Sequence, residues 1–245
     1  MTSEKTPSFL KDIATLFKVR LGFFVVLSAI LGWFMGVDTI NLTSVMLLAT
    51  GGYLLTGASN GLNQIIERDT DAIMSRTKNR PLPTGRMSVK TALFLSISAG
   101  IVGIGCLGAL NYMAAILGVI ALVLYAFFYT PLKSRTPLCV FVGAIPGALP
   151  PMIGYVAATG EFGIEPGTLF AVQFMWQFPH FWAIAWKASD DYAKAGFYLL
   201  SSKGGKDFTY AFLILLYSLF LLLVSILPVV FGFTGNIALF FIIVA

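Results

Sequence analysis

Asn63, Glu67 and Asp71 form a run of oxygen-bearing side chains spaced four residues apart. On a helix, four residues rise about 6 Å and turn about 40° past a full turn, so these three share one face and Asp69 points elsewhere. Oxygen ligands in a line suit Mg²⁺, a hard cation that is shared with substrate phosphates. Four basic residues follow at once: Arg76, Lys78, Arg80 and Arg86. Acids for a metal beside bases for an anion form the arrangement that a metal–diphosphate needs.

A second charged cluster occupies residues 187–194. Lys187 with Asp191, and Asp190 with Lys194, are spaced i, i+4. As ion pairs on a helix surface they contribute only about 0.2–0.5 kcal/mol each. The functional alternative is a second metal-binding carboxylate group that faces the first across a helix bundle. The spacing leaves both interpretations open.

His180 is the only histidine in the chain. It lies in a band of aromatic residues: Trp176, Phe178, Phe181, Trp182 and Trp186. A lone histidine on an apolar helix is more often a hydrogen-bonded core or interface residue than a ligand. The alternative is contact with a porphyrin, through its iron or a propionate.

The composition shows what kind of element must position these residues. The chain has 245 residues, of which 58% are hydrophobic and 11% charged, whereas a soluble domain is about 25% charged. It is therefore predicted to be a polytopic membrane protein, which excludes disordered, collagen-like and coiled-coil classes. Cys106 and Cys139 lie in separate apolar runs, which excludes a disulfide framework and a CxxC metal site.

Seven stretches are long and apolar enough to cross a bilayer. They are residues 19–37, 42–66, 89–109, 112–131, 138–159, 167–187 and 208–232. An eighth begins at Asn236 and is partial, because it is too short to cross before Ala245, so we expect a chain truncated at its C-terminus. Residues 1–18 are predicted to form an amphipathic arm on the membrane surface rather than a signal peptide.

The basic residues predict the orientation. All 16 Lys and Arg lie in the N-terminal arm, in the loops after the second, fourth and sixth spans, or at the span ends that adjoin them. The charged residues of the alternate loops are all acidic: Asp38, Glu161 and Glu165. The positive-inside rule therefore places the N-terminus and the three basic loops in the cytoplasm. It also explains the net charge of +5 without a nucleic-acid partner, and none is expected.

The middles of the predicted spans hold no Asp, Glu, Lys or Arg. A secondary transporter usually carries ionisable groups or broken helices near the midplane. The charges here gather at the cytoplasmic ends of spans, which favours a site at the membrane–water boundary for a substrate with a charged head and an apolar tail. Transport of an anionic lipid is the alternative from another functional class.

Five segments together carry a family resemblance. They are NxxxExxxDxxMxRTxxRP at residues 63–81, YTPLKSRT at 129–136, GALPPMIGY at 147–155, WQFPHFW at 176–182 and DDYAKAG at 190–196. They resemble the UbiA-type intramembrane prenyltransferase superfamily over roughly residues 10–240. Glu67 and WQFPHFW are similar to its protohaem IX farnesyltransferase branch. The nearest alternative is a relative that prenylates a quinone precursor or a chlorophyll-type acid.

The resemblance implies an all-α, polytopic transmembrane bundle with nine helices in a ring around a central cavity, of which seven full spans and a partial eighth are visible here. Residues 1–245 would form one prenyltransferase domain in the bacterial cytoplasmic (inner) membrane. It would transfer a farnesyl group from farnesyl diphosphate to a vinyl group of haem b, giving haem O and diphosphate. Mg²⁺ is the implied cofactor, haem b is a substrate, and membrane lipid and a haem A synthase are implied partners.

The resemblance also assigns roles to residues. Asn63, Glu67 and Asp71 correspond to the first metal–diphosphate motif. Asp190 and Asp191 stand at the second acidic motif, with Asp191 placed among the metal ligands. The implied substrate-binding residues are Arg76, Arg80, Lys133 and Lys194 for the diphosphate, and His180 for the porphyrin.

Overall fold

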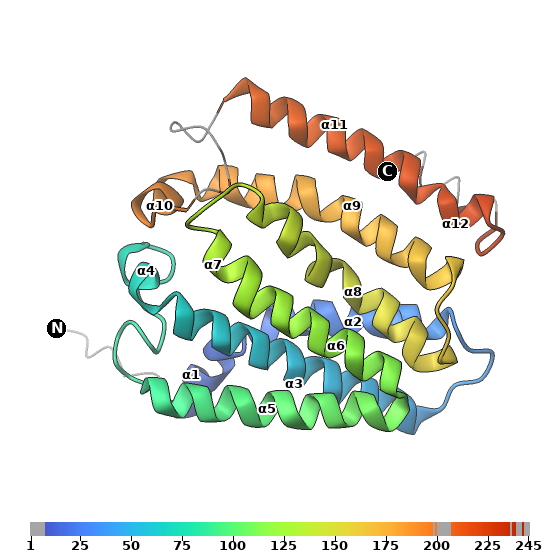
Figure 1. Cartoon of the computed structure of the whole chain (residues 1–245), viewed down its shortest axis with the longest axis horizontal. Coiled ribbons are helices and arrows are strands. Elements are labelled where there is room, and N and C mark those ends of the chain that lie inside the picture. The colour runs from blue at the N-terminus through green and yellow to red at the C-terminus, as the bar shows by residue number, and fades with distance from the viewer. Residues whose placement is uncertain (1–7, 198, 200–206, 236, 239–241, 243–245) are drawn as a thin grey trace.

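The computed structural model describes residues 8–197, 199, 207–235, 237, 238 and 242. Over those residues the chain forms helices and no strand (Figure 1). The helices are α1 (Phe9–Leu16), α2 (Val19–Phe34), α3 (Leu42–Ile66), α4 (Arg68–Ile73), α5 (Val89–Leu110), α6 (Tyr112–Val123), the π-helix η1 (Leu124–Tyr129), α7 (Thr130–Leu132), α8 (Cys139–Thr159), α9 (Ile164–Lys187), α10 (Ser189–Lys194), α11 (Phe208–Ser225) and α12 (Leu227–Val230). The predicted all-α class is confirmed.

Each of the seven predicted spans coincides with a helix or a run of consecutive helices. Within the described ranges, five are long and apolar enough to cross a membrane: α3, α5, the run from α6 to α7, α8, and α11 with α12. The pair α1 and α2, bent by 48°, makes a sixth if it is one span. Helix α9 occupies the remaining predicted span but is less apolar. The segment from Asn236 lies mostly outside the described residues.

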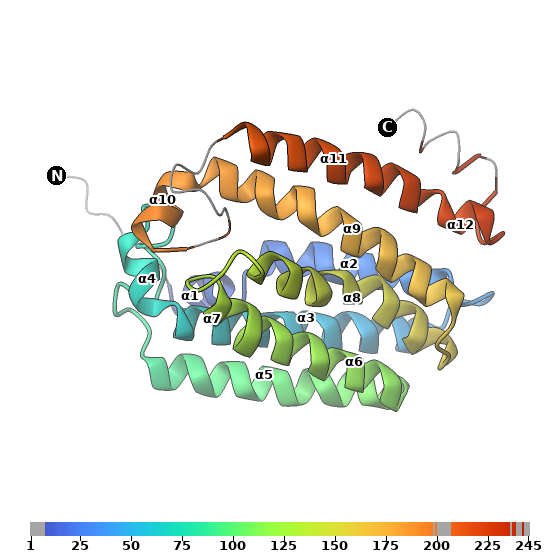
Figure 2. The ribbon, with the colours of Figure 1, turned by 45° about the horizontal axis from the view of Figure 1, so that its top comes forward.

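Five helices pack in a closed cycle. Helix α2 contacts α3, α3 contacts α5, α5 contacts α6, α6 contacts α8, and α8 returns to α2. Helix α9 lies against α8, and α11 lies on the outer side of α9 in both views (Figure 2). These apolar helices form an integral membrane bundle. The central cavity expected inside it stays a prediction.

The contact between α2 and α8 depends on two glycines. A side chain at Gly32 would collide with the backbone carbonyl of Pro151, and one at Gly154 would collide with that of Ala29. Small residues allow such backbone-to-backbone approach between membrane helices. This contact holds the cycle closed on the side opposite α5.

Polar caps fix the ends of the helices. The Asn41 side chain accepts a hydrogen bond from Ser44 N at 3.1 Å and starts α3. The Asn111 side chain accepts one from Ala114 N at 2.8 Å and starts α6. It also donates to the Val156 carbonyl at 2.6 Å, which ties α6 to α8.

The helix that begins at α6 contains one widened turn. Within η1 the backbone N–H of Thr130 donates to the Tyr125 carbonyl, five residues earlier, and the Thr130 hydroxyl donates to the same oxygen at 2.8 Å. The wider turn changes the register of the residues after it, so that Thr130 and Lys133 face α3. The sequence predicts an ordinary helix over 112–131, and nothing in its pattern marks this turn. Such π-turns occur frequently at functional sites.

Candidate active site

The charged helices α1, α4 and α10 gather at one end of the bundle, together with α7, which Lys133 follows (Figure 1). Helix α3 ends there at Ile66, yet its hydrogen-bond spacing continues. Glu67 N donates to the Asn63 carbonyl at 2.9 Å, and Asp71 N donates to the Glu67 carbonyl at 2.7 Å. The helical spacing of this motif is therefore kept as far as Asp71. Asn63, Glu67 and Asp71 are all buried, with 1%, 7% and 0% of each residue exposed. Asp69 is exposed and pairs with Arg68.

The orientation of the Asn63 amide follows from its neighbour. Asn63 Nδ2 donates to Thr130 Oγ1 at 3.0 Å. That hydroxyl has already given its hydrogen to the Tyr125 carbonyl, so it can only accept from Asn63. The Asn63 amide is thereby held with its nitrogen toward α7, and its Oδ1 is the atom left for a ligand.

Each carboxylate of this group is paired through one oxygen. Lys133 Nζ lies 2.8 Å from Glu67 Oε1, and Arg80 Nη1 lies 2.6 Å from Asp71 Oδ2. Asp71 Oδ1 is buried and has no hydrogen-bond partner in the described part of the chain. An orphaned buried carboxylate oxygen is unfavourable unless a cation or donor is supplied to it.

Burial and charge act against each other at these pairs. Burial raises the pKa of Asp71, and the Arg80 guanidinium lowers it by less. Burial lowers the pKa of Lys133, but Glu67 and the neighbouring tyrosines raise it by more, so its net direction is upward. Lys133 also lies 4.6 Å from the centre of the Tyr129 ring. It is therefore held as a cation beside Glu67.

The donor set fits Mg²⁺. Asn63 Oδ1, one oxygen of Glu67 and Asp71 Oδ1 are hard oxygen atoms on one buried face, the ligand type that Mg²⁺ prefers. Among the described residues, no three His, Cys, Asp or Glu side chains lie close enough together to hold a metal ion. The structure therefore does not bring Asp191 into one cluster with Glu67 and Asp71.

Asp191 instead joins α10 to the loop after α4. Its carboxylate accepts hydrogen bonds from Ser75 Oγ at 2.6 Å, Ser75 N at 3.1 Å and Arg76 N at 3.1 Å. These donors lower the pKa of Asp191, so it is ionised at neutral pH. Asp190 is exposed, and among the described residues it accepts one hydrogen bond, from the Ser189 hydroxyl at 3.4 Å.

The helix that carries these acids is interrupted. Helix α9 ends at Lys187 and α10 begins at Ser189, so the two possible i, i+4 ion pairs of this cluster do not form in the described structure. The break turns Asp191 toward the first motif. Surface ion pairing as the role of Asp191 is therefore wrong.

Replacing Asp191 with alanine should release α10 from the loop. The amides of Ser75 and Arg76 would lose their acceptor, so we expect hydrogen exchange at both to become faster than in the wild type. Asp190→Ala is the matched control, because that side chain makes no contact with the loop. Unchanged protection in Asp191→Ala, or equal deprotection by both variants, would contradict this role.

The remaining predicted residues lie at the same end or nearby. Arg76 and Lys194 are exposed, and their side chains form no ion pair in the described structure. His180 is exposed on α9, and its ring stacks on Trp176 with the centroids 4.2 Å apart. No ion pair joins it to an acidic residue in the described structure.

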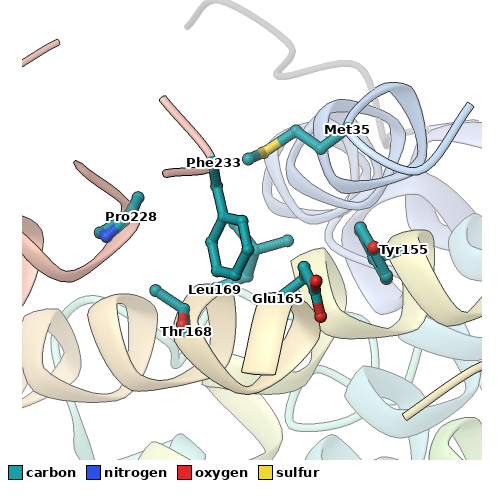
Figure 3. Close-up of a pocket in the computed structure, with 7 residues that line it drawn as sticks. All are labelled: Met35, Tyr155, Glu165, Thr168, Leu169, Pro228 and Phe233. Carbon is teal, nitrogen blue, oxygen red and sulfur yellow. The ribbon is translucent and has the colours of Figure 1, made fainter. Parts of the chain in front are cut away.

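A separate cavity of about 310 Å³ lies at the opposite end of the bundle (Figure 3). Met35 from the end of α2, Tyr155 from the end of α8 and Glu165 from the start of α9 point toward it. It is separated from Asn63 and Glu67 by the length of the helices. It therefore does not belong to the charged site.

Sequence reasoning missed the residues that orient the acids. Thr130 and Tyr125 act through the π-turn, and Ser75 through Asp191. The YTPLKSRT segment gave a partial signal, since Thr130 and Lys133 both lie in it. No pattern pointed to Ser75, because its partner is 116 residues away.

The chain is similar to proteins of a known family over most of its length. The model of the UbiA prenyltransferase family matches residues 22–245. A protein of Christiangramia forsetii named protoheme IX farnesyltransferase is 53% identical over 232 residues, which are 95% of this chain and 77% of that protein.

Two solved structures share the fold. A UbiA homologue from Aeropyrum pernix K1 matches with a TM-score of 0.74 at 21% identity, covering 92% of this chain and 84% of that one. A UbiA homologue from Archaeoglobus fulgidus, described as bound to GPP and Mg²⁺, matches with a TM-score of 0.71 at 16% identity, covering 95% of this chain and 86% of that one.

Proposed function

Because this chain belongs to the UbiA prenyltransferase family, we propose that it transfers a farnesyl group from farnesyl diphosphate to a vinyl group of protohaem IX, releasing diphosphate. The acceptor is inferred from the relative that is 53% identical and bears that activity in its name. A quinone-precursor acceptor is the nearest alternative, and WQFPHFW and Glu67 favour haem over it.

The observation that carries the proposal is the paired arrangement of the acids. Glu67 and Asp71 each keep one oxygen beyond the one held by Lys133 and Arg80, at the end of a bundle of membrane helices. A prenyl diphosphate needs the same two features, charged groups for its head and an apolar region for its chain. An anionic-lipid transporter has no need of a metal-binding stripe.

The chain's own residues have defined tasks in this reaction. The bond between C1 of the farnesyl chain and the diphosphate oxygen breaks, and its electron pair leaves with the diphosphate. Lys133 and Arg80 stabilise the negative charge that builds there. The π electrons of the vinyl group bond its terminal carbon to C1, which leaves a cation on the vinyl carbon next to the macrocycle. Water adds to that carbon with loss of a proton, which gives the hydroxyethylfarnesyl group of haem O.

Asn63, Glu67, Asp71 and Asp191 are the residues that would hold Mg²⁺. When bound, the metal supplies positive charge that neutralises the leaving diphosphate. Asp191 comes from α10 and is hydrogen-bonded to the loop that carries Ser75 and Arg76. Arg76 and Lys194 are proposed to bind the diphosphate from the exposed side.

His180 is proposed to contact the porphyrin. It is exposed, and its ring stacks on that of Trp176, so the two form an aromatic surface that suits a flat macrocycle. We expect His180→Ala to weaken haem binding more than farnesyl diphosphate binding. Titration of both substrates into the variant tests this; a loss confined to farnesyl diphosphate would remove His180 from the porphyrin site.

Incubation of the purified protein with haem b, farnesyl diphosphate and Mg²⁺, followed by mass analysis of the haem, tests the function. We expect haem O and one diphosphate for each haem converted, and no product after chelation of the metal. Prenylation of a quinone precursor with haem untouched would identify the alternative acceptor. No diphosphate release with any acceptor would favour a transporter.

Thr130→Val should weaken the metal site without touching a ligand. It removes the acceptor that orients Asn63, so the amide is free to turn its nitrogen toward the metal. We expect the apparent Mg²⁺ affinity, measured from the metal dependence of turnover, to fall about 10–100-fold. Thr130→Ser keeps the hydroxyl and should stay near the wild type. Equal Mg²⁺ dependence in all three proteins would show that Thr130 has no such role.

The end with α1, α4, α7 and α10 is proposed to face the cytoplasm, in the bacterial inner membrane. The basic residues support this. A cysteine at exposed Ser134 should react only with a membrane-permeant reagent in intact spheroplasts, and one at exposed Thr39 should react with an impermeant reagent. The reverse pattern would invert the topology. A haem A synthase that consumes haem O is the proposed partner enzyme, which co-purification from membranes tests.

A further inference from the structure

The corner between α1 and α2 is turned by a residue in an unusual conformation. Lys18 has φ 49° and ψ 56°, which makes it the one non-glycine residue at positive φ in the described chain. An L-residue other than Gly, Asn or Asp seldom adopts this left-handed conformation, because its Cβ crowds the backbone. Lysine has no side-chain property that favours it. Such strain persists only where the surrounding structure enforces it, often at functional sites.

Helix α3 enforces this corner. Gln64 and Asn60 donate amide hydrogens to the backbone carbonyls of residues 15–17, at N···O distances of 2.7, 3.1 and 3.5 Å. The Phe17 ring fits against Gly57, where a side chain would collide with it. Asn60 and Gln64 lie on the same stretch of α3 as Asn63. The corner is therefore fixed against the segment that carries the first acidic motif.

The Lys18 side chain is half-buried at this corner, within the electrostatic range of the charges of the site. Two cations, Arg80 and Lys133, repel its ammonium, and two carboxylates, Glu67 and Asp71, attract it. Both carboxylates are already paired with those cations. Within the described residues, Lys18 itself forms no side-chain hydrogen bond and no ion pair.

A partly buried ammonium without an anion is unfavourable, and so is the backbone conformation that places it there. The two unfavourable features occur at one residue, and the nearby carboxylates of Asp71 and Glu67 are already paired with Arg80 and Lys133. An anion of high charge, bound between Lys18, Arg80 and Lys133, would satisfy all three. The diphosphate head of a prenyl donor has that charge and several acceptor oxygens.

We propose that Lys18 binds the diphosphate group directly, as a cation that the α1–α2 corner contributes to the site. The inference rests on the proposed function for the identity of the donor. It adds a residue of the N-terminal arm to the proposed diphosphate-binding residues, which otherwise lie between α3 and α10. The arm is then part of the active site rather than only a surface anchor.

The test is binding of two ligands, farnesyl diphosphate and inorganic diphosphate, by calorimetry in the presence of Mg²⁺. Lys18→Gly removes the ammonium and adopts the left-handed corner without strain, so it should fold. Lys18→Met removes the charge and keeps the length, and Lys18→Arg keeps the charge. Lys11→Met is the matched control, because Lys11 is an exposed lysine on the same arm.

We expect Lys18→Gly and Lys18→Met to raise the Kd of both ligands about tenfold or more, as loss of a charge-assisted hydrogen bond does. Lys18→Arg and Lys11→Met should bind like the wild type, and haem binding and melting temperature should not change in Lys18→Gly. An unchanged Kd in Lys18→Gly overturns the proposal. So does a loss for farnesyl diphosphate alone, since the ammonium would then act on the hydrocarbon end.

The two proposals fail in different ways. If the wild type binds farnesyl diphosphate but makes no haem O, the acceptor is wrong and the role of Lys18 is still decided by the Kd values. If haem O forms and Lys18→Gly binds normally, only the role of Lys18 is wrong. If the wild type binds neither diphosphate ligand, both are wrong.

Discussion

The protein with Asp71 replaced by alanine is expected to lose farnesyl transfer by about 10²-fold or more. Asp71 is proposed to hold the metal–diphosphate, and a carboxylate in that role contributes several kcal/mol to the transition state. Asp71 is fully buried, and its Oδ1 has no partner in the described structure. Single-turnover rates with saturating haem and farnesyl diphosphate measure the loss.

Asp71→Asn separates chemistry from folding. The amide oxygen can still accept from Arg80 and fills the same volume, so this variant should stay folded and remain inactive. Asp69→Ala is the control, since the Asp69 side chain is 85% exposed and pairs only with Arg68. Wild-type rates in both Asp71 variants would end the hypothesis that this residue binds the metal.

Lys133→Met should lower the stability of the fold by about 3–5 kcal/mol, because it leaves Glu67 as a buried and unpaired carboxylate. The side chains of this pair are only 11% and 8% exposed, so solvent cannot take over from the missing ammonium. We expect a clearly lower melting temperature in detergent and no turnover. Arg135→Met, at an exposed position of the same loop, should melt like the wild type.

A double variant separates the loss of stability from the loss of turnover. Adding Glu67→Gln to Lys133→Met removes the unpaired charge, so the melting temperature should recover in large part. Turnover should not recover, because the diphosphate still lacks the Lys133 ammonium. Recovery of activity, or a wild-type melting temperature in Lys133→Met alone, would contradict the role of this ion pair.

The sequence predicted the parts of the site that are local in the chain. The four-residue spacing of Asn63, Glu67 and Asp71 needs only helical geometry, and the structure keeps all three on one buried side. The spans follow from runs of apolar residues, which the bilayer requires. Arg80 was among the predicted anion-binding residues because it follows Asp71 closely.

The pairing of the acids was not predictable in the same way. Glu67 and Lys133 are 66 residues apart, and their contact depends on how α7 packs against α3. The sequence left Asp191 open as an ion-pair partner of Lys187 or as a metal-binding carboxylate, because it gives no sign that the helix breaks at residue 188. Lys18 carries no signal at all, since lysine is not a residue type that indicates a left-handed turn. These features are set by tertiary contacts that override local preference.

The π-turn at Leu124–Tyr129 limits how this segment can change in length. An α-helix advances about 100° for each residue, so deletion of one residue there would close the turn and swing Thr130 and Lys133 away from Asn63 and Glu67 together. The outward side chains of Phe127 and Phe128 are exposed and can be exchanged for other apolar ones. Descendants of this chain can therefore vary these two exposed positions, whereas a single insertion or deletion inside the segment would displace the partners of Asn63 and Glu67 together.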